Sequence, residues 1–140
     1  MTNDVKAWLS RCYELGDLLE HLAARREEMY SRLTGATGSV DRIGGTKTKD
    51  PHLFDALAGI DYEISQTAAR LDESRLEVFR LVQSINDRRY RIVLMGRYYE
   101  CQSWAEIGAF LGLEVRQVHR IHGEALKAAE ARLRANNTKL

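Results

Sequence analysis

Residues 104–125 read WAEIGAFLGLEVRQVHRIHGEA, and their spacing predicts two short helices joined by a tight turn. Apolar residues recur where the two helices would face each other. Gly108 falls at the crossing, where a side chain larger than Ala would hold the helices apart, and Gly112 falls in the turn, where Gly adopts a left-handed backbone freely. The seven constrained positions of this helix-turn-helix are Ile107, Gly108, Leu111, Gly112, Leu113, Val118 and Ile121.

The second of these helices carries long hydrogen-bond donors on positions that the core does not use. No carboxylate lies between Val115 and Gly123. A recognition helix places its first turns in the major groove of DNA, where Arg can donate two hydrogen bonds to guanine. We therefore expect Arg116 and Arg120 to reach base edges. Further DNA contacts are expected from Gln117, His119, His122, Ser103 as a helix cap, Arg97 and Lys127.

Charge is unevenly distributed along the 140 residues, although the net charge is only +1. Residues 1–83 hold 11 Lys or Arg against 14 Asp or Glu, and residues 84–140 hold 10 against 6. An anionic partner would thus belong to the C-terminal part. The alternative is an ordinary packed helix pair with a solvated polar face, and the basic character of that face argues against it.

The first 85 residues have a heptad pattern of apolar residues. It predicts one helix over about residues 4–33, capped by Asn3 or Asp4, and a second that starts at Pro51 with Asp50 as its cap. Gly, Ser and Thr fill residues 34–49 between them, which predicts a loop. A break near Ser84–Asp87 then precedes a helix from about Asp87. The expected fold is all-α, with an antiparallel coiled-coil hairpin over 1–85 and a DNA-binding domain over 86–140.

A single seam between two helices buries little apolar surface, and packing against a second copy of the hairpin would bury more. We therefore expect a homodimer. The predicted oligomerisation seam is Leu57, Ile60, Ile64, Leu71 and Val78. The alternative is a monomer whose hairpin packs on its own C-terminal domain.

Other functional classes find little support in the sequence. The run GGTKTK, which ends at Lys49, lacks the glycine spacing of a phosphate-binding loop. His119 and His122 stand three apart without further ligands for zinc, and the acidic residues form no catalytic constellation. We expect no enzyme activity, no cofactor and no metal. Cys12 and Cys101 lie in helical patterns as isolated thiols, which, without a signal peptide or an apolar membrane span, predicts a cytoplasmic protein.

The run SWAEIGAFLGLEVRQVHRIHGEALK is similar to region 4 of sigma factors. The wider chain resembles small phage-encoded proteins with a sigma-like C-terminus, including late-gene activators of the ArpU and RinA type. That resemblance covers nearly the whole chain and is most specific over residues 84–129. It implies binding to promoter DNA in the bacterial host cytoplasm, and contact with host RNA polymerase.

By matched position, the sigma-factor residues that read the −35 element fall on Val115, Arg116 and Arg120. Val115 stands where Arg is usual, and Glu114 replaces the usual Thr or Ser cap, so the DNA sequence that is read should differ from a standard −35 box. The region that melts DNA is missing, so activation would need another factor's polymerase. Two alternatives stay open: a small terminase-like packaging subunit, and a polymerase-binding protein that does not itself read DNA.

Overall fold

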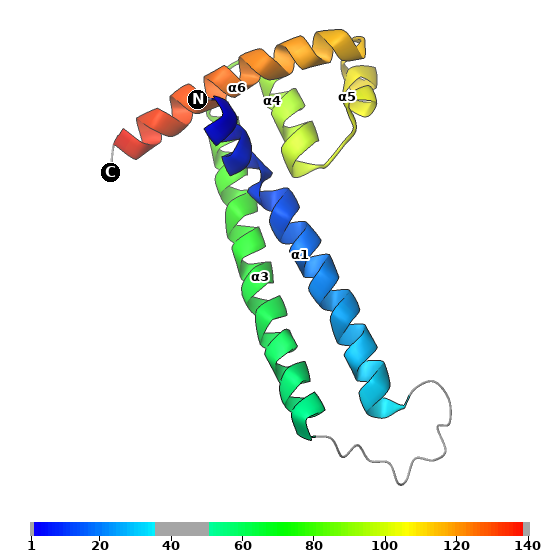
Figure 1. Ribbon diagram of the computed structural model, residues 1–140. Coiled ribbons are helices and arrows are strands. Elements are labelled where there is room, and N and C mark those ends of the chain that lie inside the picture. Colours follow the sequence, from blue (N-terminus) through cyan, green and yellow to red (C-terminus); the bar gives the residue numbers. More distant parts are fainter. Residues whose placement is uncertain (1, 36–50, 139–140) are drawn as a thin grey trace. The chain divides into compact units, whose positions relative to one another are not determined.

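The computed structural model describes residues 2–35 and 51–138, and all elements in these ranges are helical (Figure 1). The prediction of an all-α chain is confirmed. The predicted loop lies outside the described residues from residue 36 onwards, as does Asp50 as a helix cap. In chain order the elements are α1 (Thr2–Thr34), α3 (Pro51–Gln83), α4 (Arg88–Leu94), the π-helix η2 (Met95–Tyr99), α5 (Trp104–Leu111) and α6 (Val115–Thr138).

The starts of the two long helices follow from their first residues. α3 begins at Pro51 as predicted, because a fixed φ and a missing N–H suit the first helical position. α1 begins at Thr2, so Asn3 and Asp4 lie inside its first turn and do not cap it. The predicted cap of α1 is therefore wrong by one or two residues.

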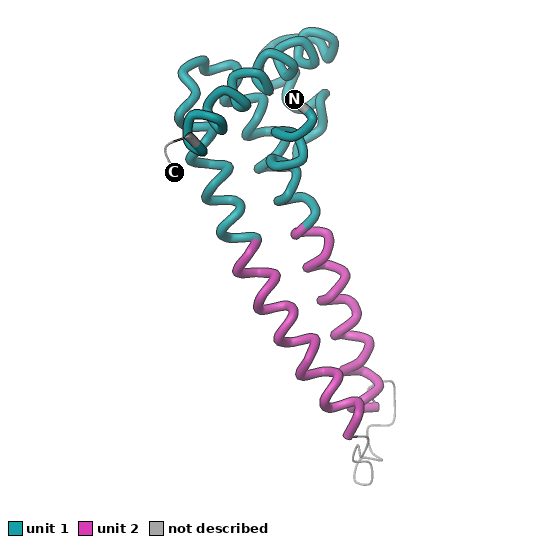
Figure 2. Tube along the Cα trace, turned by 60° about the vertical axis from the view of Figure 1, so that its left-hand side comes forward, with its two compact units in different colours: residues 1–14, 71–140 teal, residues 15–70 magenta. Residues whose placement is uncertain are grey.

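The chain forms two compact units, drawn in different colours in Figure 2. Unit 1 is Met1–Glu14 with Leu71–Leu140, and unit 2 is Leu15–Arg70. This division does not follow the border predicted at residue 85, because both ends of the 1–85 segment share a core with the C-terminal helices. The buried residues of that core are Val5, Leu9, Cys12, Val78, Leu81, Val82, Ile85, Leu94, Tyr98, Ala125, Leu126 and Ala129.

Unit 2 contains the remaining part of α1 and the first part of α3. Three of its described residues are buried, namely Met29, Leu57 and Thr67. Arg26, the polar residue in the heptad pattern of α1, donates its Nε–H to Asp61 of α3 at 2.5 Å. The ion pair therefore occupies the place of an apolar contact between the two helices.

Two of the five residues of the predicted oligomerisation seam are buried within the single chain. Leu57 and Val78 are buried, and Ile60, Ile64 and Leu71 are half-buried. The two buried residues present no surface to a second copy. Their expected role in oligomerisation is thus corrected to packing within the chain.

The heptad pattern ends between α3 and α4. Asp87 caps α4 by accepting a hydrogen bond from the N–H of Arg89 at 2.9 Å, as the predicted break and helix start require. Cys101 follows η2 with a left-handed φ of 58° and lies outside any helix, so its predicted helical setting is wrong. Among the described residues, no helix is long and apolar enough to cross a membrane.

Candidate nucleic-acid interface

α5 starts at a reciprocal pair of hydrogen bonds. The N–H of Glu106 donates to Ser103 Oγ at 3.1 Å, and the N–H of Ser103 donates to Glu106 Oε1 at 2.8 Å. This capping box confirms Ser103 as the helix cap. It also places a carboxylate at the helix N-terminus and uses the Ser103 N–H, so the predicted phosphate contact at Ser103 would meet a negative charge.

Two glycines set the turn between α5 and α6. Gly112 has a φ of 72°, and its N–H donates to the last turn of α5. A Cβ on Gly108 would stand 2.7 Å from the carbonyl oxygen of Leu113, and 3.4 Å from Cγ2 of Val118. The closest neighbour of Gly108 is thus the turn backbone rather than the second helix. The prediction that Ala would fit there is wrong, since even a methyl group is too large.

The predicted core of this segment is confirmed. Ile107 and Val118 are completely buried, and Ile121 is buried with them and with Val93 of α4. Leu111 and Leu113 are half-buried and pack against this cluster. Val118 and Ile121 turn one face of α6 into this core, so the opposite face of the helix lies in solvent.

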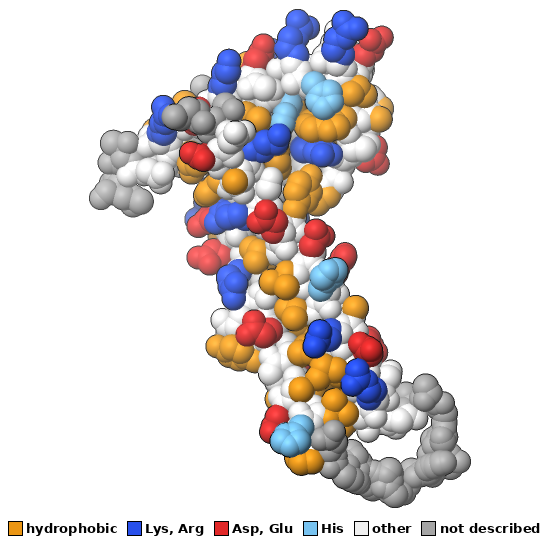
Figure 3. Space-filling model, in the orientation of Figure 1, with side chains coloured by type: hydrophobic (Ala, Val, Ile, Leu, Met, Phe, Trp, Pro, Cys, Tyr) orange, Lys and Arg blue, Asp and Glu red, His pale blue; other side chains and the backbone are white. Residues whose placement is uncertain are grey.

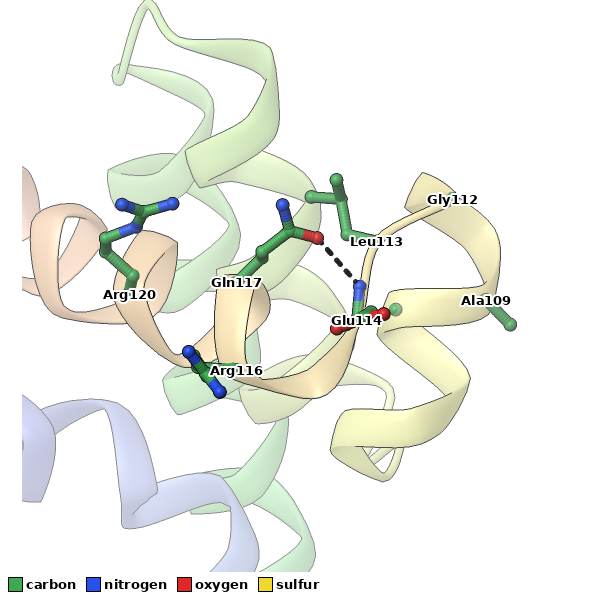
Figure 4. A pocket seen from close by; sticks show the side chains of 8 residues that line it. Ala109, Gly112, Leu113, Glu114, Arg116, Gln117 and Arg120 are labelled. Atoms are coloured by element: carbon green, nitrogen blue, oxygen red, sulfur yellow. Dashed lines mark hydrogen bonds between the residues drawn. The ribbon is translucent and has the colours of Figure 1, made fainter.

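That solvent face of α6 carries the basic side chains. Arg116, His119, Arg120 and Lys127 are all exposed. In Figure 3, Lys and Arg side chains line the edge of the molecule that α6 forms, with Asp and Glu side chains between them. Arg116 and Arg120 also line an open groove of about 840 Å³ between α6, the turn and α5, together with Gly108, Ala109, Gly112, Leu113, Glu114 and Gln117 (Figure 4).

Gln117 has a structural role that the sequence reasoning missed. Its Oε1 accepts the N–H of Glu114 at 3.0 Å, drawn as a dashed line in Figure 4. The side chain therefore reaches back to the start of α6, where Glu114 cannot cap the helix as Thr or Ser would. Gln117 is also one of the residues that line the groove.

His122 was expected on the exposed face, and this is wrong. It is buried, and its Nε2 lies 2.8 Å from the Tyr98 hydroxyl oxygen. Burial, together with the nearby positive charges of Lys6, His119 and Arg97, lowers the pKa of His122 to about 4. Its ring is neutral at pH 7, so it offers no positive charge to an anionic partner. Burial also raises the pKa of Tyr98 to about 12.

Helical spacing alone could have placed His122 correctly. It follows Val118 by four residues and precedes Ala125 by three, and both of these are completely buried. His122 was expected on the exposed face because its side chain is polar and close to Arg120, although its helical position is that of a buried residue. No pattern in the sequence pointed to Tyr98 as its partner.

Arg97 makes several contacts within unit 1. Its guanidinium carbon lies 4.3 Å from the centre of the Trp104 ring, and Nη1 donates to the carbonyl of Gln102 at 3.2 Å. The Tyr13 hydroxyl donates to the Arg97 carbonyl. Exposed His119 also contacts Trp104, with the two ring centres 4.5 Å apart. Arg97 is thus half-buried and packs on Trp104, and its expected phosphate contact stays a prediction.

The arrangement contains no metal-binding cluster of three or more His, Cys, Asp or Glu within residues 2–35 and 51–138. His122 turns inward to Tyr98, so the pair His119 and His122 does not form a two-histidine site on one exposed face. What the exposed residues can do chemically is donate hydrogen bonds and carry positive charge.

Comparison of the chain with family models, with curated proteins and with solved structures found no match.

Proposed function

We propose that this protein is a sequence-specific, double-stranded-DNA-binding transcription regulator, in which α5, the turn at Gly112 and the start of α6 act as a sigma-region-4-like helix-turn-helix. The observation that carries the proposal is the exposed pair Arg116 and Arg120 on a groove beside a rigidly built turn. Residues 1–14 and 71–85 belong to the same compact unit as this helix-turn-helix.

The rigid turn is what makes base reading chemically reasonable. Discrimination between bases needs donors held in one geometry. The start of α6 is tied to the turn by two hydrogen bonds, from the Leu113 N–H to the Gly108 carbonyl at 2.9 Å and from the Glu114 N–H to Gln117 Oε1 at 3.0 Å. Arg116 and Arg120 are four residues apart, so both project from the same side of α6. Their guanidinium groups can each donate twice to guanine O6 and N7, while Lys127 supplies charge for a phosphate.

The wider role rests on the sequence resemblance. It favours a phage late-gene activator that works with host RNA polymerase. Val115 is exposed at the start of α6, where the resembling pattern has Arg, so the site read should differ from a standard −35 box at that position. The proposed homodimer must use a surface other than buried Leu57 and Val78.

The test is the affinity of Arg120→Ala for two duplexes, one selected by the wild-type chain and one with that site scrambled. Loss of a base-reading Arg should cost about 1–3 kcal/mol on the selected site and much less on the scrambled one. Arg132→Ala is the matched control, because Arg132 is also exposed on α6 but lies outside the groove. It should lower both affinities slightly and equally. Equal losses on both duplexes for Arg120→Ala would refute base reading.

The oligomeric state separates the regulator from a packaging subunit. Light scattering of the full chain should give a dimer. A ring of eight or more chains would contradict the regulator and favour the small terminase-like alternative.

A further inference from the structure

Gly123 lies within the 24-residue helix α6, where Gly is a poor choice. Gly in a helix interior is less stable than Ala, because it loses more backbone freedom on folding. Packing does not explain it, since a Cβ at this position would meet nothing within 4 Å, and the residue is exposed. The folded chain by itself therefore gains nothing from this glycine.

Its place on α6 supplies a reason. Gly123 follows Arg116 by seven residues, Arg120 by three, and precedes Lys127 by four, so these residues lie along one stripe of the helix. His119 belongs to the same stripe, and every member is exposed. The exposed carboxylate that borders the stripe, Glu124, accepts a hydrogen bond from the Tyr90 hydroxyl at 3.0 Å. Gly123 is thus a bare stretch of backbone in the middle of a basic face.

We propose that Gly123 is the point at which a DNA sugar-phosphate strand passes closest to α6. This inference rests on the proposed function and extends it beyond the groove at the helix start. Because Gly123 has no side chain, the helix backbone can lie closer to the strand than a residue with a Cβ would allow, by the width of a methyl group or more. Arg116 and Arg120 then reach base edges on one side of the strand, while Lys127 meets a phosphate on the other side.

The test uses substitutions whose effects on folding and on binding have opposite signs. Gly123→Ala should raise the unfolding midpoint of the full chain by about 3–5 °C, because Ala is the better helix former. The same change should weaken binding to the selected duplex about tenfold, comparable to loss of one base contact. Gly123→Leu should weaken binding further while the fold is retained.

Gly59→Ala is the matched control, since Gly59 is also an exposed helical glycine whose Cβ would meet nothing within 4 Å. It should raise the midpoint without changing DNA affinity. Unchanged affinity for both Gly123→Ala and Gly123→Leu, with the wild-type chain still binding the selected duplex, would overturn the inference alone. Failure of the wild-type chain to bind any duplex would overturn the proposed function and the inference with it.

Discussion

Unit 1 and unit 2 use the same kind of helix in different ways. In unit 1, residues from six helical elements share buried cores. The turn after α5 is closed by the left-handed Gly112 and by the Leu113 N–H, which donates to the Gly108 carbonyl at 2.9 Å. In unit 2, residues 15–35 and 51–70 bury only Met29, Leu57 and Thr67, and one of these is polar. The difference teaches that geometric precision is concentrated where the basic face is, whereas the helices of unit 2 need only stay paired.

The largest contrast should come from removing the same atoms in each unit. Ile107→Ala deletes a completely buried side chain of unit 1 and should lower the free energy of unfolding by about 2–5 kcal/mol. Ile60→Ala deletes a half-buried side chain of unit 2 and should cost clearly less. Chemical denaturation of both variants measures this. Equal losses would mean that the two units are packed equally well.

Acid should act on unit 1 through His122. The folded-state pKa is about 4, below the ordinary value of 6.5, so the unfolded chain binds this proton first as pH falls. Stability from this group is complete above pH 6.5 and is lost towards pH 4, by about 2 kcal/mol at pH 5. His122→Gln keeps a partner for Tyr98 without this titration. Its denaturation profile between pH 7 and pH 5 should be flatter than that of wild type, and parallel profiles would contradict the assignment.

Unit 2 should respond in the opposite direction to one substitution. The Thr67 hydroxyl is completely buried and has no hydrogen-bond partner among the described residues. Thr67→Val keeps the shape and removes the unpaired polar group, so it should stabilise the chain by about 1 kcal/mol. Thermal unfolding measures the gain. Destabilisation would show that the hydroxyl has a partner in solution, and Thr67→Ser serves as the control that retains it.

The smallest effect should come from the ion pair of Arg26 and Asp61. The two side chains are 36% and 49% exposed, so water screens most of their attraction. A double-mutant cycle with both residues changed to Ala should give a small coupling energy that falls further in high salt. A coupling as large as the loss for Ile60→Ala would mean that this pair, rather than the apolar seam, holds unit 2 together.

Local rules predicted much of the candidate interface correctly. The break before Asp87, the cap at Ser103, the left-handed Gly112 and the buried Ile107 all follow from residue type and spacing, which act over only a few residues. These features need no knowledge of distant parts of the chain.

The errors arose where distant segments meet. The sharing of one core by Val5, Val78 and Leu126 depends on tertiary packing, so the border at residue 85 could not be derived from the heptads. The contacts of Arg97 with Trp104 and Tyr13 likewise depend on tertiary packing. His122 is different, because its helical register was available and its polarity was given too much weight.

The central claim, that the exposed face of α6 reads DNA sequence, is tested most directly by selection from a random pool of duplexes. The full wild-type chain should enrich one motif that contains guanine, and a chain with Arg116→Ala and Arg120→Ala should enrich none while unfolding at the same temperature. Recovery of the unselected pool by the wild-type chain, or the same motif from both chains, would contradict the claim.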